Sequence, residues 1–258
     1  MSEGMAGKSV LITGAGRGLG RAYGEALAAA GANVLINDVD AAEANAAAEG
    51  IVAAGGVARA HSGTIATWDG AAAAVEECIS AFGAIDGLVN NAGQTASSPI
   101  ATSNDVQWRN DYELKVVSAL HVTRAVLPAL EATQGAIINV LAVLARAPGA
   151  STTPTSASRL AGLALTKSLA SEVGPRGIRA NAILIGIIES GQWVRRAEGA
   201  GVSVEEFYQT TARNMHIPLG RVGRADEFAD LASYLLSPRA SYVTGIGIAL
   251  DGGLSPVI

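Results

Sequence analysis

Residues that bind metals or form cross-links are scarce in this sequence. It contains one cysteine, Cys78, so a disulfide framework and a thiolate metal site are both excluded. Cys78 lies in a predicted helix, and we expect it to be a small core residue. The three histidines, His61, His121 and His216, lack the spacing of metal ligands. We therefore expect no metal.

Clusters of like charge and long apolar runs are also lacking. The 258-residue chain has 18 basic and 23 acidic residues, and no run of like charge suits nucleic acid or an anionic membrane. No apolar run reaches the roughly 18 residues of a membrane span, and residues 1–7 lack the basic and apolar regions of a signal peptide. These absences predict a cytoplasmic protein that binds neither nucleic acid nor a membrane.

The apolar residues that are present follow an alternating pattern. They make up 49% of the chain, and we expect one domain over residues 1–258. Short aliphatic runs alternate with longer alanine-rich stretches, which predicts an α/β fold: a Rossmann-type, doubly wound parallel sheet of about seven strands with helices on both faces. The expected strands are 9–12, 33–37, 57–60, 87–89, 136–140, 178–184 and 245–250. The expected helices reach about residue 30 and span 41–54, 68–82, 104–133, 155–173 and 226–236. Residues 190–218 interrupt the alternation.

A glycine-rich turn, residues 13–20 (TGAGRGLG), lies between the first strand and the first helix. In that context glycines allow the helix N-terminus to approach a pyrophosphate. Asp38 ends the second strand, where a carboxylate can accept hydrogen bonds from ribose hydroxyls and would repel a 2′-phosphate, so we predict NAD rather than NADP. Arg17 argues the other way, because its guanidinium could pair with that phosphate. The alternative is a plain tight turn, with Asp38 capping the next helix.

Three further motifs accompany the glycine turn: Asn90–Gly93 (NNAG), Ile217–Gly223 (IPLGRVG) and Asp251–Gly253 (DGG). Together with the TGxxxGxG turn they resemble the short-chain dehydrogenase/reductase family over essentially the whole chain. The resemblance implies an irregular, mobile lid at 190–218 over a small-molecule substrate. It also implies dimers or tetramers formed through the long helices, as a homo-oligomer or with a related subunit. The cofactor contacts it implies are Gly14, Arg17, Gly18, Leu19, Gly20, Asp38, Thr64, Ile65, Asn91, Ala92, Gly93, Arg159, Gly186 and Ile188.

The flanking residues align four positions of this chain with the family's catalytic tetrad, and at each of them the residue differs from that of the family. In the family a tyrosine transfers a proton, and a lysine four residues later lowers the pKa of that tyrosine and holds the nicotinamide ribose. A serine orients the substrate, and an asparagine carries a water. The corresponding residues here are Thr155, Arg159, Ala142 and Glu113.

These substitutions predict that ordinary carbonyl reduction is impaired. A threonine alcohol is far less acidic than a phenol, and Thr155 is too short to reach the place of the phenol oxygen. Arg159 stays protonated and cannot relay protons. We expect Glu113 and Arg159 to form an ion pair; the sharper alternative is that Glu113 is a general acid or base and Arg159 holds an anionic intermediate. Tyr208, in the lid, is an outside candidate for the missing phenol.

Three functions remain open. The first is an NAD-dependent oxidoreductase with a non-standard proton donor. The second is a non-catalytic subunit, or pseudoenzyme, that assembles with an active paralogue. The third is a non-redox lyase, hydratase or isomerase that uses Glu113.

Overall fold

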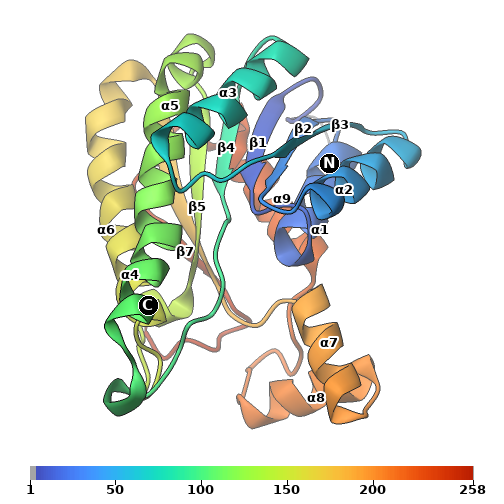
Figure 1. Ribbon diagram of the computed structural model, residues 1–258, viewed down its shortest axis with the longest axis vertical. Coiled ribbons are helices and arrows are strands. Elements are labelled where there is room, and N and C mark those ends of the chain that lie inside the picture. The colour runs from blue at the N-terminus through green and yellow to red at the C-terminus, as the bar shows by residue number, and fades with distance from the viewer. Residues whose placement is uncertain (1–3, 258) are drawn as a thin grey trace.

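A seven-stranded parallel sheet forms the centre of the computed structural model, which describes residues 4–257 (Figure 1). Its strand order is β3-β2-β1-β4-β5-β6-β7, and each neighbouring pair is parallel. The strands are β1 (Ser9–Thr13), β2 (Asn33–Asp38), β3 (Val57–Ser62), β4 (Gly87–Asn90), β5 (Ala136–Ala142), β6 (Arg179–Ile185) and β7 (Gly247–Leu250). The predicted fold class and strand positions are confirmed.

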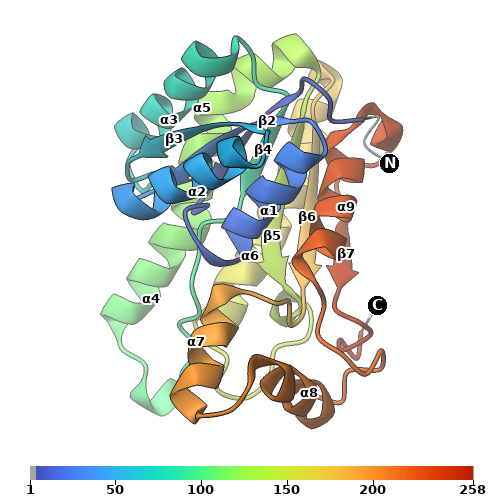
Figure 2. The same cartoon turned by 90° about the vertical axis from the view of Figure 1, so that its right-hand side faces the viewer.

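Helices cover both faces of this sheet (Figures 1 and 2). One face is covered by α1 (Gly18–Ala29), α2 (Ala41–Ala53) and α9 (Ala225–Leu236). The other is covered by α3 (Trp68–Phe82), α5 (Ser118–Thr133) and α6 (Thr155–Val173). Alternate residues of a strand point to opposite faces, so Val10 and Ile12 of β1 enter the first core and Leu11 the second. This explains why the strands are apolar throughout. Cys78 is fully buried in the second core, as predicted.

The predicted long helix over 104–133 is divided, which corrects the expectation of one continuous helix. It consists of α4 (Asp105–Tyr112), a π-helical turn (Glu113–Val117) and α5. The Ser118 amide donates to the Glu113 carbonyl five residues earlier, so this turn holds one more residue than an α-helical turn. The extra residue changes which side chains face the sheet after Tyr112. Single π turns of this kind often occur at functional sites.

The segment expected to be irregular, 190–218, is mostly helical. It contains α7 (Gly191–Ala200) and α8 (Val204–Asn214), which lie beyond the carboxyl ends of the strands (Figure 2). Gly201 ends α7 with a positive φ of 69°, and the Ser203 hydroxyl caps α8 by accepting from the Glu206 amide. Short 3-10 turns lie at Ile100–Thr102, Val143–Ala145, Gly174–Arg176 and Pro238–Ala240. Of the helices within residues 4–257, none combines the length and the apolar character needed to cross a membrane.

Candidate active site

The glycine turn brings the backbone of β1 against the segment after β4. A Cβ on Gly20 would lie 2.4 Å from the side-chain nitrogen Nδ2 of Asn91 and 2.4 Å from the Gly14 carbonyl oxygen. Gly14 has a φ of 61°, and its Cβ would lie 2.8 Å from Ala92 Cα. At the N-cap of α1, Arg17 makes no side-chain capping hydrogen bond, which leaves the first amides of the helix for a ligand. The site fits a pyrophosphate, because glycines and open helix amides are what such a group needs.

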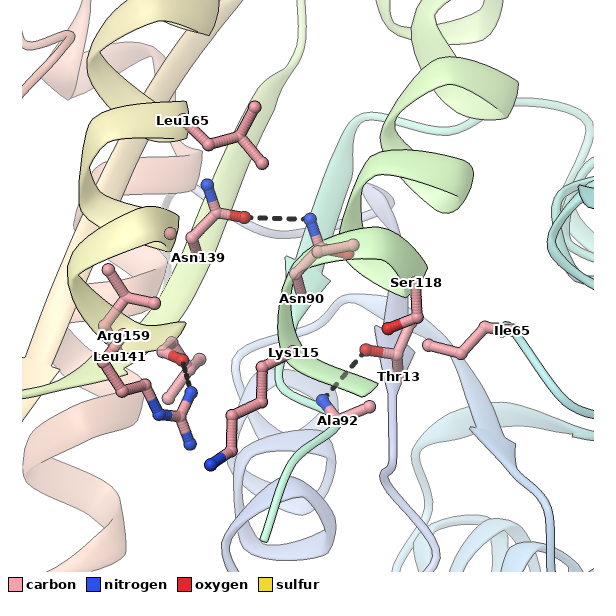
Figure 3. A pocket seen from close by; sticks show the side chains of 13 residues that line it. Thr13, Ile65, Asn90, Ala92, Lys115, Ser118, Asn139, Leu141, Arg159 and Leu165 are labelled. Atoms are coloured by element: carbon pink, nitrogen blue, oxygen red, sulfur yellow. Dashed lines mark hydrogen bonds between the residues drawn. The ribbon is translucent and has the colours of Figure 1, made fainter. Parts of the chain in front are cut away.

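Thr13 and Asn91 tie the two strand ends together. The Thr13 hydroxyl accepts hydrogen bonds from the Asn91 and Ala92 amides at 3.0 and 3.1 Å. The Asn91 side chain donates to the Thr13 and Gly14 carbonyls at 3.0 and 2.9 Å. Asn90 extends the network, donating to the Asn139 side chain of β5 at 2.9 Å (Figure 3). The NNAG segment therefore holds the glycine turn in place.

Asp38 points at the glycine turn. Its carboxylate accepts from the Gly16 amide at 3.0 Å and from the Asp40 amide at 3.1 Å. Helix α2 is capped by Asp40, whose side chain accepts from the Ala42 and Glu43 amides, so the alternative in which Asp38 is the cap is wrong. Asp38 thus lies next to the turn with its orientation fixed by two backbone donors.

The other expected cofactor residues follow the carboxyl ends of β3 and β6. Thr64 and Ile65 come after β3, and the Thr64 hydroxyl accepts from the Ala66 amide at 3.2 Å. Gly186 donates its amide to the Leu250 carbonyl, and a Cβ there would lie 2.7 Å from the Asp251 Cβ. Ile188 is buried. Because parallel strands end at one edge, these segments share the edge that carries the glycine turn.

Thr155 and Arg159 lie one helical turn apart on α6, as expected, but Glu113 does not join them. Its side chain is exposed, and among residues 4–257 no ion pair connects it to Arg159, so the predicted Glu113–Arg159 pair is wrong. Arg159 Nη1 instead donates to the Val140 carbonyl oxygen at 2.6 Å. The π turn is the physical reason, because it turns Lys115 inward and leaves Glu113 on the surface.

Lys115 is the site residue that the sequence analysis missed. Its side chain is 1% exposed and forms an ion pair with Asp111, which is equally buried. Lys115 Nζ also donates to Thr155 Oγ1 at 3.0 Å, and Ser158 Oγ donates to Asp111 Oδ2 at 2.5 Å. The sequence does hold a signal, since Asp111 and Lys115 have the i, i+4 spacing and order that favour a helical ion pair.

Burial changes the acid–base properties of this cluster. Desolvation lowers the pKa of Lys115 to about 8, although the hydrogen bond that Lys115 donates to Asp111 acts in the opposite direction. Arg159 contributes a second, smaller decrease to the Lys115 pKa because its positive charge is close. Desolvation also lowers the pKa of Arg159, and the Asp111 carboxylate opposes that change. Lys115 is therefore a buried amine that can exchange a proton near neutral pH.

Lys115 and Arg159 reach into the same space from the π turn and from α6 (Figure 3). They line a cavity of about 10 Å³ together with Asn90, Asn139 and Ala92, a volume close to that of one water molecule. Arg159 Nε is buried without a hydrogen-bond partner, and a Cβ on Gly93 would lie 3.1 Å from Arg159 Nη2. The guanidinium therefore faces the end of the NNAG segment with donors to spare.

Two other expected site residues, Ala142 and Tyr208, make no hydrogen bond to the Lys115 and Arg159 cluster within the described residues 4–257. Ala142 ends β5 and has no polar side-chain atom to offer a substrate. Tyr208 packs in the lid against Ala212, Ile217 and Val222, and burial raises the pKa of its phenol. No metal-ligand cluster of three or more side chains occurs in the part of the chain that the structure describes.

Comparison with known proteins agrees with this architecture. The family model described as enoyl-(acyl carrier protein) reductase matches residues 14–255. The trans-4-hydroxycyclohexanecarboxylate dehydrogenase of Sinomonas cyclohexanicum is 31% identical, over 98% of this chain and 95% of the relative. The chain belongs to the short-chain dehydrogenase/reductase family.

Solved structures of short-chain dehydrogenases/reductases have the same fold. A short-chain oxidoreductase from Pseudomonas aeruginosa PAO1, described as containing an atypical catalytic center and bound to NADPH, is 36% identical with a TM-score of 0.91 over 100% of this chain and 99% of that one. The L-sorbose reductase of Gluconobacter frateurii, complexed with NADPH and L-sorbose, is 30% identical with a TM-score of 0.92 over 100% of both chains. Nicotinamide cofactor binding is thus the common feature of these neighbours.

Proposed function

We propose that this chain is an NAD-dependent oxidoreductase that interconverts an alcohol and a carbonyl group of a small molecule. The observation that carries the proposal is the intact nucleotide site, in which the glycine turn, the NNAG segment and Asp38 are joined by hydrogen bonds. A bound nicotinamide cofactor supplies a hydride or accepts one. Glycine at positions 14 and 20, where a Cβ would clash with the chain itself, keeps the turn in the conformation that leaves the helix amides open to a pyrophosphate.

The choice of NAD rests on Asp38. Two backbone amides hold its carboxylate next to the glycine turn, where it can accept from ribose hydroxyls. A 2′-phosphate at the same place would meet a like charge. NADPH in the two solved neighbours, together with the exposed Arg17 in the turn, favours the opposite preference, so the two cofactors are compared directly in the experiment below.

The proposal includes an altered catalytic centre. We infer that Thr155, Arg159 and Ala142 take the places of the family's tyrosine, lysine and serine. For the place of the asparagine we propose Lys115 rather than Glu113, because the Lys115 side chain points inward and contacts Thr155. Arg159 can hold a ribose hydroxyl or a developing negative charge with its spare donors. It cannot transfer a proton, because a guanidinium stays charged.

Calorimetric titration with NADH and with NADPH tests the cofactor part of the proposal. We expect NADH to bind at least tenfold more tightly. Turnover is then followed by NADH absorbance with two ketone probes, L-sorbose and 4-oxocyclohexanecarboxylate, and 4-deuterated NADH should slow it if hydride transfer limits the rate. Absence of binding of either cofactor at millimolar concentration would contradict the oxidoreductase proposal. Tighter binding of NADPH than of NADH would overturn the choice of NAD.

A second candidate, the non-catalytic subunit, is favoured by the closed set of contacts around Asp111. Lys115 and Ser158 satisfy its two carboxylate oxygens, as expected for charges that are kept for structure. Purification from the native host separates the two candidates. A scaffold should co-purify with a catalytic homologue, whereas a homo-oligomer that oxidises NADH on its own would exclude this role.

A further inference from the structure

The hydroxyl of Thr155 has both acceptor positions in use. It accepts from the Ala96 amide at 3.0 Å and from Lys115 Nζ at 3.0 Å. A threonine oxygen offers two lone pairs and one proton, so these bonds leave the proton as its remaining hydrogen-bonding group. The Thr155 hydroxyl therefore has its proton free to donate, and Lys115 is one of the two groups that donate to its oxygen.

The acid strength of Thr155 by itself is far too low for the role of the family tyrosine. Its contact with Lys115 removes this obstacle, because the threonine can take a proton from Lys115 as it gives one up. No free alkoxide then has to form. Because the threonine side chain is shorter than a tyrosine, the relay requires a substrate that approaches Thr155 more closely or one bridging water.

We propose that Thr155 and Lys115 form a two-residue proton relay that replaces the family tyrosine, with Thr155 facing the substrate and Lys115 acting through it. The proposal rests on the oxidoreductase function above. In the reducing direction the carbonyl carbon would receive the hydride that a bound reduced nicotinamide would supply, which forms the new C–H bond while the carbonyl π electrons move to oxygen. That oxygen takes the Thr155 proton, Thr155 takes one from Lys115, and Lys115 is left as a neutral amine. Oxidation runs the same transfers in reverse.

The groups around Lys115 suit this exchange. Asp111 from α4 stabilises the ammonium, Arg159 from α6 disfavours it, and burial disfavours it further. These opposing effects bring the Lys115 pKa to about 8. Below that pH the relay holds the proton that reduction needs, and above it Lys115 is the amine that oxidation needs.

Activity and pH profile form the first test. Thr155→Val removes the hydroxyl without removing a charge, and we expect reduction of the ketone probe to fall about 100-fold or more, the usual contribution of a general acid. Thr155→Ser should restore most of it. In the wild type, kcat for reduction should fall above about pH 8. Lys115→Arg keeps the charge and cannot release the proton, so its kcat should be far lower and should no longer decrease above about pH 8. NADH affinity should change less than about threefold in each variant.

Matched controls use the same substitutions elsewhere. Thr133→Val removes a hydroxyl that donates to the Ile85 carbonyl at the opposite edge of the sheet, and Lys167→Arg replaces an exposed lysine of α6. Both should keep wild-type rates. Full activity of Thr155→Val with an unchanged pH profile would overturn the relay while leaving the oxidoreductase function intact. Failure of the wild type to bind NADH is a separate result, which overturns the proposed function instead.

A second measurement needs neither cofactor nor substrate. The Lys115 pKa is followed by NMR of ¹³C,¹⁵N-lysine-labelled protein, with the signal assigned by its loss in Lys115→Arg. Thr155→Val should lower this pKa, because the ammonium loses an acceptor, and Thr155→Ser should return it to the wild-type value. A Lys115 that titrates like a solvent-exposed lysine, or that is insensitive to Thr155→Val, contradicts the relay.

Discussion

Replacing the buried Asp111–Lys115 pair should change how stability depends on pH. The pKa of Lys115 is about 8 in the folded protein and about 10.5 in the unfolded chain. Between these values the unfolded chain binds more protons, so the free energy of unfolding rises with pH. At roughly 1.4 kcal/mol per pH unit, the gain over this window is about 3 kcal/mol. Below pH 8 the full cost of burying the ammonium is present.

The double variant Asp111→Asn/Lys115→Met lacks this contribution and removes both charges of the ion pair together. Urea unfolding at about pH 7.5 and about pH 10 gives the free energy of unfolding for each protein. Because pH 10 lies below the pKa of the unfolded lysine, the difference between the wild type and the double variant should shift by about 2.4 kcal/mol in favour of the wild type at the higher pH. Lys167→Met, which removes an exposed lysine, serves as the control and should follow the wild type. Equal pH slopes for the wild type and the double variant would refute the depressed pKa.

Three further predictions concern the nucleotide site and the core. Gly20→Ala should weaken NADH binding more than about tenfold in calorimetry, because its Cβ would lie 2.4 Å from the Asn91 side chain; unchanged affinity would show that the turn is not where the cofactor binds. Asp38→Asn should raise the NADPH-to-NADH affinity ratio at least about tenfold, and Asp40→Asn, which preserves the cap of α2, should leave that ratio unchanged. Tyr23→Phe should raise the free energy of unfolding by about 1 kcal/mol, since the phenol oxygen is buried without a partner; a loss of stability in urea unfolding would mean that the hydroxyl is satisfied.

Much of the fold can be predicted from local sequence patterns. The seven strands lie where short aliphatic runs predicted them, and α3 and α6 have the predicted bounds. Strands that are buried on both faces are apolar throughout, and glycines mark the ends of several helices. Both signals lie within a few consecutive residues, so they can be recognised without the tertiary structure. The glycine turn and the NNAG segment could be recognised for the same reason, because both are contiguous motifs.

The lid was harder to predict than the sheet. Residues 191–214 mix apolar and charged residues, yet they form α7 and α8. The helical period is present there, and it was obscured because these short helices bury little of their surface and Gly201 separates them. Their small core joins Ala212, Ile217 and Val222, which are apart in sequence and meet only when the segment folds back.

The sequence by itself determined the sheet and the glycine turn, and it is the basis on which Thr155, Arg159 and Ala142 are proposed to replace the family's tyrosine, lysine and serine. Tertiary structure decided which charges meet. A π turn after Tyr112 rotates Lys115 toward α6 and Glu113 toward solvent, and the packing of α4 beside α6 brings Asp111 to Ser158. A one-residue change in helical register moves a side chain by about 100°, and helix packing against distant segments, rather than local propensity, selects that register.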